Sequence, residues 1–244
     1  MHESSPSLLR GPLPERTNFF RRFPDTDGVN TFTIDKSPAF LRLNDGSALT
    51  RKLLPGSKIV LTLCDPAERM VSEYYHSLKR SADSFRQKFQ REGLTQPADF
   101  QEFTDIVMGN SPNCTKSNNY CQKLHRHWRE QGRYVYYLKQ WLREYPADEI
   151  LIINMDDPAK ENAMKLVEFA GMPKEEYPWE ELEEKARAYV NKAYSGRESA
   201  WHDYPRAMHT ISKLFAPTNQ ELAELIGQDF PLHWNSTIAD VPKQ

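Results

Sequence analysis

The stretch "KIVLTLCDPAERMVSEYYHSL" (residues 58–78) joins a strand pattern directly to a helix pattern. Residues 58–64 form a nearly continuous apolar run, which is typical of a strand covered on both faces in a parallel sheet. The chain then turns at Asp65, a favoured helix N-cap, and at Pro66, since proline is favoured at the first helical position. The stretch therefore predicts a buried strand followed at once by a helix over residues 66–80.

Similar patterns recur on both sides of this stretch. Strands are predicted for "NTFTID" (residues 30–35) and "EILIINM" (149–155). Helices are predicted over residues 134–145, over 158–172 with a stop at Gly171, and over 207–227, bent or broken in two at Pro217. The alternation of strands and helices predicts an α/β domain with a parallel central sheet between two helical layers.

Length and composition fit one such domain. The chain has 244 residues, of which 39% are hydrophobic and 27% charged, so it can bury a sizeable core. We expect a single domain over residues 1–244. Within it, residues 1–14 are expected to be irregular, and residues 81–131 to form a polar insertion on the side of a substrate.

The overall charge excludes some functions. A formal net charge of -2 gives no basic field of the kind that binds nucleic acid, so any anion site must be local. No run of about 18 apolar residues occurs, so no membrane span is expected in this chain.

Two features bear on the cellular compartment. Cys114 and Cys121 lie close together in "SPNCTKSNNYC", where they form either a small disulfide loop or two free thiols. Asn113 and Asn235 each begin a glycosylation tripeptide, a pattern that also arises often by chance. Together they give weak support for a secretory compartment.

Polar residues follow two of the predicted strands. In open α/β sheets, ligands bind beyond the carboxyl ends of the strands, and a helix N-terminus there favours an anion. Asp35 and Lys36 follow one strand, and Arg69 and Ser72 lie on the helix after the other. These residues predict a phosphate pocket. The alternative is an ordinary helix start with a solvated Arg69 and Ser72, and with Asp35 as a turn cap.

Four blocks of the sequence, in this order, resemble the sulfotransferases that modify glycosaminoglycans, and most of all the heparan sulfate N- and 3-O-sulfotransferases. The resemblance spans residues 15–234 and implies the three-layer, P-loop NTPase-like sulfotransferase fold. The blocks are "TIDKSPAF", "LLPGSKIVLTLCDPAERMVSEYYHSL", "GRYVYYLKQWLREYPADEILIINMDDPAKENAMKLVEFAGM" and "LFAPTNQELAELIGQDFPLHW".

The resemblance implies transfer of a sulfuryl group from 3′-phosphoadenosine 5′-phosphosulfate (PAPS) to a carbohydrate hydroxyl or amine. It implies no metal and a place in the Golgi lumen, held by an anchor that this sequence does not contain. Asp35 falls on the catalytic carboxylate, which is usually Glu in the family, with Lys36 beside it and His76 near the acceptor. Ser72 falls on the hydroxyl that holds the 3′-phosphate of the donor, and Arg69 accompanies it.

Two further positions in the donor site are compared with the family. Cys64 stands where many relatives carry an arginine for the 3′-phosphate, although an inert buried thiol is the simpler interpretation. The segment "NKAYSGRESAWHDYP" matches a loop that closes over the donor, with Lys192, Gly196 and Arg197 as phosphate contacts. The alternative for this segment is a solvated loop.

One family feature is missing from the sequence. Neither Gly-x-x-x-x-Gly-Lys nor Lys-x-Gly-Thr occurs, although the family holds the 5′-phosphosulfate in such a loop. We therefore expect the fold to be N-terminally incomplete or degenerate, and donor binding to be weak. The rival hypotheses are an inactive carbohydrate-binding or scaffold protein that lost donor binding and, more remotely, a nucleotide kinase-like P-loop protein.

Overall fold

The fold comes from a computed structural model of the 244-residue chain. The chain forms two compact units. Unit 1 is Met1–Ile59 with Tyr136–Ile150, and unit 2 is Val60–Val135 with Leu151–Gln244. The structure describes residues 34–35, 41–43, 45–91, 97–112, 114, 119–173, 177–181, 183–185 and 197–236.

Unit 1 contains α3 (Gly46–Leu53), most of α7 (Tyr134–Glu144) and the short 3-10 turn η2 (Ala147–Glu149). Helix α7 confirms the helix predicted over residues 134–145, and its apolar face is buried at Leu138 and Trp141. Tyr145 follows this helix and is buried, with the Arg51 guanidinium 4.9 Å from its ring centroid and its hydroxyl 3.1 Å from Ser57 Oγ.

Two parallel strands form the described sheet: β1 (Ile59–Leu63) beside β2 (Ile150–Asn154). Both confirm strands predicted from apolar runs. The expected cover on both faces of β1 is wrong, because burial alternates along the strand and Val60 is 40% exposed. Of the third predicted strand, over residues 30–35, the structure describes only Ile34 and Asp35, and neither has strand geometry.

Helix α4 (Pro66–Arg91) follows β1 as predicted. The Asp65 carboxylate caps it by accepting the Ala67 backbone N–H at 2.8 Å. The helix continues to Arg91 instead of ending at residue 80. The reason is visible in the sequence, since residues 81–91 contain neither glycine nor proline and Phe89 anchors the second half by complete burial.

Two helices complete the segment predicted to be an insertion. Helix α5 (Phe100–Met108) is capped by Asp99, whose carboxylate accepts the Glu102 N–H, and ends at Gly109 in the left-handed conformation. Helix α6 (Asn119–Gln131) follows, and a disulfide joins its Cys121 to Cys114 with Cα atoms 5.8 Å apart. The sequence left open either a disulfide or two free thiols, and the structure has the disulfide.

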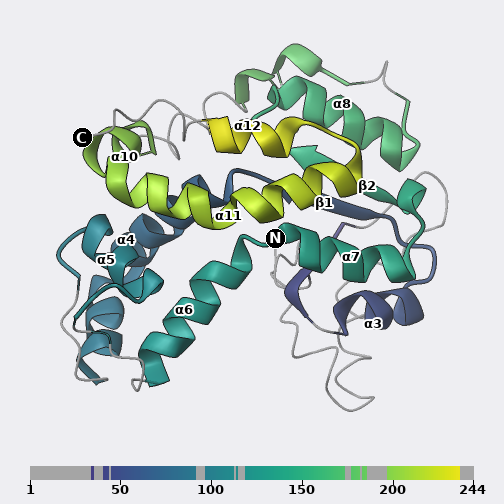
Figure 1. The fold of residues 1–244 in the computed structure, drawn as a ribbon. Helices are drawn as coiled ribbons and strands as arrows, with labels where there is room; N and C mark the ends of the chain where they lie inside the picture. The colour runs from purple at the N-terminus through teal and green to yellow at the C-terminus, as the bar shows by residue number, and fades with distance from the viewer. Residues whose placement is uncertain are drawn as a thin grey trace. The chain divides into compact units, whose positions relative to one another are not determined.

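The C-terminal part of unit 2 is helical. Helix α8 (Ala159–Ala170) stops at Gly171 as predicted, where φ is +76°. Helices α10 (Arg197–Asp203), α11 (Pro205–Ile226) and α12 (Phe230–Ser236) follow, and α11 packs on α4, α5, α10 and α12 (Figure 1). Of the two forms predicted at Pro217, a bend or a break, the break does not occur, because burial of Phe215 and Leu222 on either side of it outweighs the one lost hydrogen bond.

The core of unit 2 is aromatic at its centre. Tyr74 of α4 lies 4.8 Å from Phe103 of α5 between ring centroids, and Phe103 lies 4.8 Å from Trp128 of α6. Met208, Ile211 and Phe215 of α11 close the same cluster. This core fixes the positions of α4 and α6. Among the helices that the structure describes, none is both long and apolar enough to cross a membrane.

Candidate functional site

Helix α4 has two faces with different roles. Ala67, Met70, Val71 and Tyr74 are buried in the core of unit 2. Helical spacings of three and four residues place Arg69, Ser72 and His76 together on the opposite face. Ser72 is half-buried and His76 exposed. Three of the predicted site residues are therefore brought together along one side of the helix that follows β1.

Arg69 is the most constrained of the three. Its Nη1 atom donates to Glu73 Oε2 at 2.6 Å and to Gln131 Oε1 of α6 at 2.9 Å. Its Nε and Nη2 atoms are buried and have no hydrogen-bond partner in the part of the chain that the structure describes. A buried donor left unpaired costs roughly 1–3 kcal/mol, and more when it is charged. The guanidinium is thus held ready for an acceptor, and an anion suits its fork of donors best.

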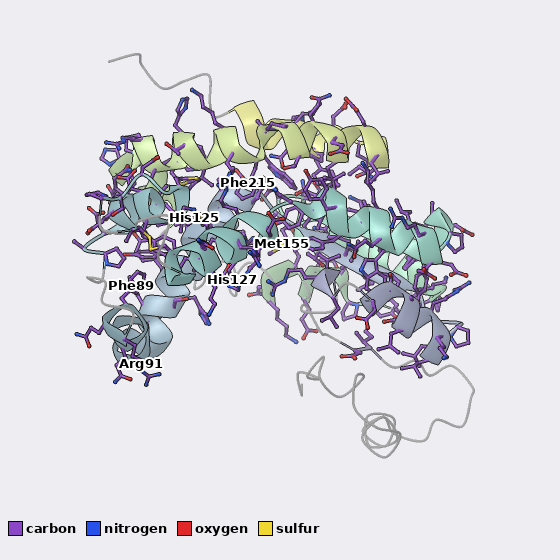
Figure 2. All side chains as sticks on the ribbon, turned by 60° about the horizontal axis from the view of Figure 1, so that its bottom comes forward. Phe89, Arg91, His125, His127, Met155 and Phe215 are labelled. Carbon is purple, nitrogen blue, oxygen red and sulfur yellow. A yellow bond between two sulfur atoms is a disulfide. The ribbon has the colours of Figure 1, made fainter. Side chains whose placement is uncertain are left out.

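Glu73 and His127 orient this arginine. His127 Nε2 lies 3.7 Å from Glu73 Oε1, and the His127 ring also hydrogen-bonds to Gln131. Burial acts to raise the pKa of Glu73, but the hydrogen bond from His127 and the charge of Arg69 outweigh it and hold this pKa below its usual value. Glu73 therefore stays ionised and keeps Arg69 in place. Figure 2 labels His127 on α6.

Cys64 lies at the tip of β1, at the position that was compared with an arginine of the family. Cys64 is buried, and its Sγ atom lies 4.0 Å from the hydroxyl of Tyr134, the first residue of α7. Burial, with Cys64 alongside, raises the pKa of Tyr134 well above its usual value, so the phenol stays neutral. The Tyr134 ring packs edge-on against Trp234 of α12. Cys64 is placed as a packing residue of unit 2.

Asp65 is an acidic group in an unfavourable environment. Burial raises its pKa to about 7, with further increases from the nearby charges of Glu68 and Asp156 and a partial offset from the Ala67 N–H. Asp156, which follows β2, accepts a hydrogen bond from Trp234 Nε1 at 3.0 Å. The carboxyl ends of both strands therefore place acidic side chains near the start of α4, and Asp65 changes charge close to neutral pH.

The turn after β2 is rigidly held. Asn154 donates to Asp157 Oδ1 at 3.0 Å, and Asn162 of α8 donates to the Asn154 carbonyl at 2.7 Å. Lys165 pairs with Asp157 at 2.7 Å. Exposed Met155 lies in this turn and is labelled in Figure 2. These contacts fix the place of Asp156.

Gly132 and Tyr134 stand two residues apart at the start of the block "GRYVYYLKQWLREY", and the packing of Gly132 explains this spacing. A Cβ atom there would lie 2.5 Å from the Phe215 ring and 2.8 Å from Pro66 Cβ, both closer than packed atoms approach. Glycine lets the corner between α6 and α7 rest on the start of α4, and Tyr134 then reaches Cys64. Sequence reasoning noted the motif without assigning Gly132 or Tyr134 to the site, and it missed Gln131 and His127 because no local pattern marks them.

The remaining predicted residues lie elsewhere or outside the described chain. Asp35 is half-buried and belongs to unit 1, so its approach to Ser72 stays a prediction. Lys36, Asn113, Lys192 and Gly196 lie outside the described residues. Arg197 begins α10 and Asn235 lies in α12, but their side chains are not described. Within the described part of the chain, no cluster of His, Cys, Asp or Glu side chains could hold a metal ion.

Comparison with known proteins defines the class. The sulfotransferase domain family model matches residues 22–216, and the chain belongs to that family. It is similar to carbohydrate sulfotransferase 15 of mouse and of rat, each 25% identical over 194 residues, and to the human protein of that name, 24% identical over 194 residues. Each match covers 75% of this chain and 32% of the relative, so the chain spans about a third of the length of these curated relatives.

Proposed function

We propose that this protein transfers a sulfuryl group from PAPS to a hydroxyl or amine of a carbohydrate, and that it has the three-layer, P-loop-like sulfotransferase fold. The proposal assigns to these residues the side of the donor site that holds the 3′-phosphate. Membership of the sulfotransferase family supports the reaction class. The names of the similar proteins support a carbohydrate acceptor.

The buried guanidinium of Arg69 carries the assignment. Its Nε and Nη2 atoms have no acceptor among the described residues, and it lies in the first turns of α4, where the helix dipole also favours an anion. Ser72 shares this face and offers a hydroxyl. A guanidinium that is paired with Glu73 on one side and has two buried nitrogens without an acceptor on the other fits a phosphate better than it fits a purely structural role.

The chemistry follows from the residue types. The acceptor oxygen or nitrogen forms a bond to sulfur while the bond between sulfur and the 5′-phosphate oxygen breaks, and the bisphosphate leaves. The acceptor proton passes to a carboxylate, for which we propose Asp35. Lys36, Lys192 and Arg197 supply positive charge for the phosphate and sulfuryl oxygens, Gly196 lets the loop approach the donor, and His76 contacts the acceptor.

The proposed compartment is the Golgi lumen. The family resemblance motivates it, and the Cys114–Cys121 disulfide supports it because disulfides persist in oxidising compartments and are rare in the cytosol. Asn113 and Asn235 are proposed glycosylation sites on the same grounds.

Binding of adenosine 3′,5′-bisphosphate tests the donor assignment. Calorimetry on the 244-residue chain should show a weak complex, with Kd between roughly 10 µM and 1 mM, because the chain lacks a recognisable 5′-phosphate loop. Ser72→Ala should weaken binding by about 1–3 kcal/mol through loss of a charge-assisted hydrogen bond. Ser77→Ala is the matched control, since it makes the same change on the same helix. Arg69→Met should remove measurable binding.

The rival function is a carbohydrate-binding protein that has lost donor binding. The unusual Cys64 and the absence of a phosphate-loop motif favour it. It predicts no nucleotide binding at millimolar concentration and no effect of Ser72→Ala on any ligand. That result would set the enzyme assignment aside for this chain.

A further inference from the structure

Helix α6 carries a basic stripe that the donor and acceptor chemistry leaves unused. Gln122, Arg126 and Arg129 follow each other at spacings of four and three residues, and Arg133, four residues further on, continues the row beyond the helix end. Such spacings place side chains on one face of a helix. Cys121, Leu124 and Trp128 occupy the core-facing side.

This stripe lines a hollow in the surface of unit 2. One shallow, open depression of about 460 Å³ is bounded by Gln122, His125, Arg126, Arg129, Glu130 and Arg133. A second, of about 410 Å³, shares Gln122, His125 and Arg129 and extends to the Cys114–Cys121 disulfide. Because they share three residues, the two form one continuous depression, which we call the α6 groove.

The groove is positively charged. In the described chain, Arg126 and Arg129 have no carboxylate partner, whereas Arg133 pairs with Glu130 at 3.0 Å. The two free guanidinium groups therefore leave an uncompensated charge in a protein whose overall net charge is -2. Arginine forks bind sulfate, carboxylate and phosphate oxygens in pairs.

The floor of the groove is preorganised. Burial, with the charge of Arg129, lowers the pKa of His125, so this ring is neutral and adds hydrogen bonding rather than charge. Gly109, with φ of +77°, lets the ring lie close, because a Cβ atom there would be 2.7 Å from His125 Cε1. Figure 2 labels His125 on α6. The disulfide fixes the start of the same helix.

We propose that the α6 groove binds an anionic stretch of the carbohydrate acceptor, at sulfate or carboxylate groups away from the one being modified. The lining of the groove runs along α6 from Cys121 to Glu130, about 14 Å along the helix axis at ~1.5 Å per residue, with Arg126 and Arg129 inside it. One small anion would occupy only the part beside these two arginines, whereas an extended polyanion would fill the whole length. The acceptor is taken to be a glycan because the inference rests on the proposed carbohydrate sulfotransferase function.

The test is binding of a size-defined sulfated glycosaminoglycan hexasaccharide to the 244-residue chain, by calorimetry at low and physiological salt. Arg126→Gln with Arg129→Gln should weaken binding by about threefold to thirtyfold, as loss of two partly exposed ion pairs allows. It should also reduce the salt dependence. Lys123→Gln with Lys213→Gln removes the same charge from α6 and α11 outside the groove, and should change affinity less than twofold.

Three outcomes overturn the inference: no hexasaccharide binding, equal losses in the two double variants, or displacement by polyglutamate as effective as by the hexasaccharide. The last result would make the groove a site for acidic protein segments. The chemically desulfated hexasaccharide should bind more weakly, and equal binding would also contradict the proposal.

Nucleotide binding separates this inference from the function on which it rests. The groove variants should bind adenosine 3′,5′-bisphosphate like the unmodified chain. If the chain binds the bisphosphate but not the hexasaccharide, the proposal for the groove is wrong and the donor site stands. If the chain binds the hexasaccharide through Arg126 and Arg129 but does not bind the bisphosphate, the proposal for the groove stands and the proposed enzymatic function is wrong.

Discussion

Asp65 couples the site to pH. Its folded-state pKa of about 7 lies above the ordinary 3.8, so the folded chain binds this proton more tightly than the unfolded chain. Its contribution therefore favours folding at acidic pH and is lost as pH rises from about 4 to about 7. Golgi-like acidity would keep Asp65 largely neutral, which also suits an incoming phosphate.

Asp65→Asn tests this coupling. The amide oxygen can still accept the Ala67 N–H, so the helix cap is kept while the buried charge is removed. Urea unfolding at pH 8 should show the variant more stable than the unmodified chain by about 1–4 kcal/mol, and the difference should shrink toward pH 5. Asp99→Asn, the same change at the cap of α5, is the control. A constant difference across this pH range would contradict the assignment.

Cys64 is predicted to be an inert thiol. It is 7% exposed and packs beside Tyr134, so an alkylating reagent should reach it only after unfolding. Mass spectrometry should find no alkylation of the folded chain, one modified cysteine in urea, and three in urea with a reductant. Rapid labelling of the folded chain would show that Cys64 is open to solvent.

At the scale of the elements, Gly132 is the contact between the α6–α7 corner and the start of α4. Gly132→Ala should destabilise the fold by about 1–3 kcal/mol, because a methyl group would overlap Phe215 and Pro66. Gly56→Ala, where nothing lies within 4 Å of the new Cβ, is the matched control and should be near neutral. Denaturant unfolding of both variants measures the difference. Equal stabilities would mean that the corner moves without cost.

The sequence predicted those elements whose signals are local. The runs that became β1 and β2, the Asp65-Pro66 start of α4 and the Gly171 stop of α8 all depend on residues within a turn of each other. The features that the sequence placed wrongly or left open depend on tertiary packing. Burial of Phe89 extends α4, and packing on both sides of Pro217 keeps α11 whole. No short window of sequence contains either contact.

In the candidate site, too, some features follow from local sequence and others only from tertiary packing. The sequence placed Arg69 and Ser72 on the helix after β1, the family resemblance added His76, and the structure has all three on one face of α4. The contacts from Gln131 and His127, some 60 residues along the chain, come from the packing of α6 on α4 and have no local signature. Periodicity can say which face of a helix a residue occupies but not which helix it meets.

At the scale of the whole molecule, the proposed function would require Asp35 of unit 1 to act with Ser72 of unit 2. In a form of the protein that transfers sulfuryl groups, Asp35→Asn should lower kcat by about 10²–10⁴-fold, the usual worth of a general base. Bisphosphate binding should stay unchanged, because the carboxylate acts on the acceptor proton in the transition state. Calorimetry and a sulfuryl-transfer assay on the same preparation separate the two effects.

Asp35→Glu is the sharper variant, because it restores the carboxylate length usual in the family. If Asp35 is a base held one methylene short, glutamate should keep or raise kcat, since misplacement by ~1 Å can cost about a hundredfold. Ser72→Ala should behave in the opposite way to Asp35→Asn, with weaker donor binding and a smaller effect on kcat at saturating donor. An unchanged kcat in Asp35→Asn would make Asp35 only a turn cap. The two units would then share no catalytic pair, and the carbohydrate-binding function would become the better account of this chain.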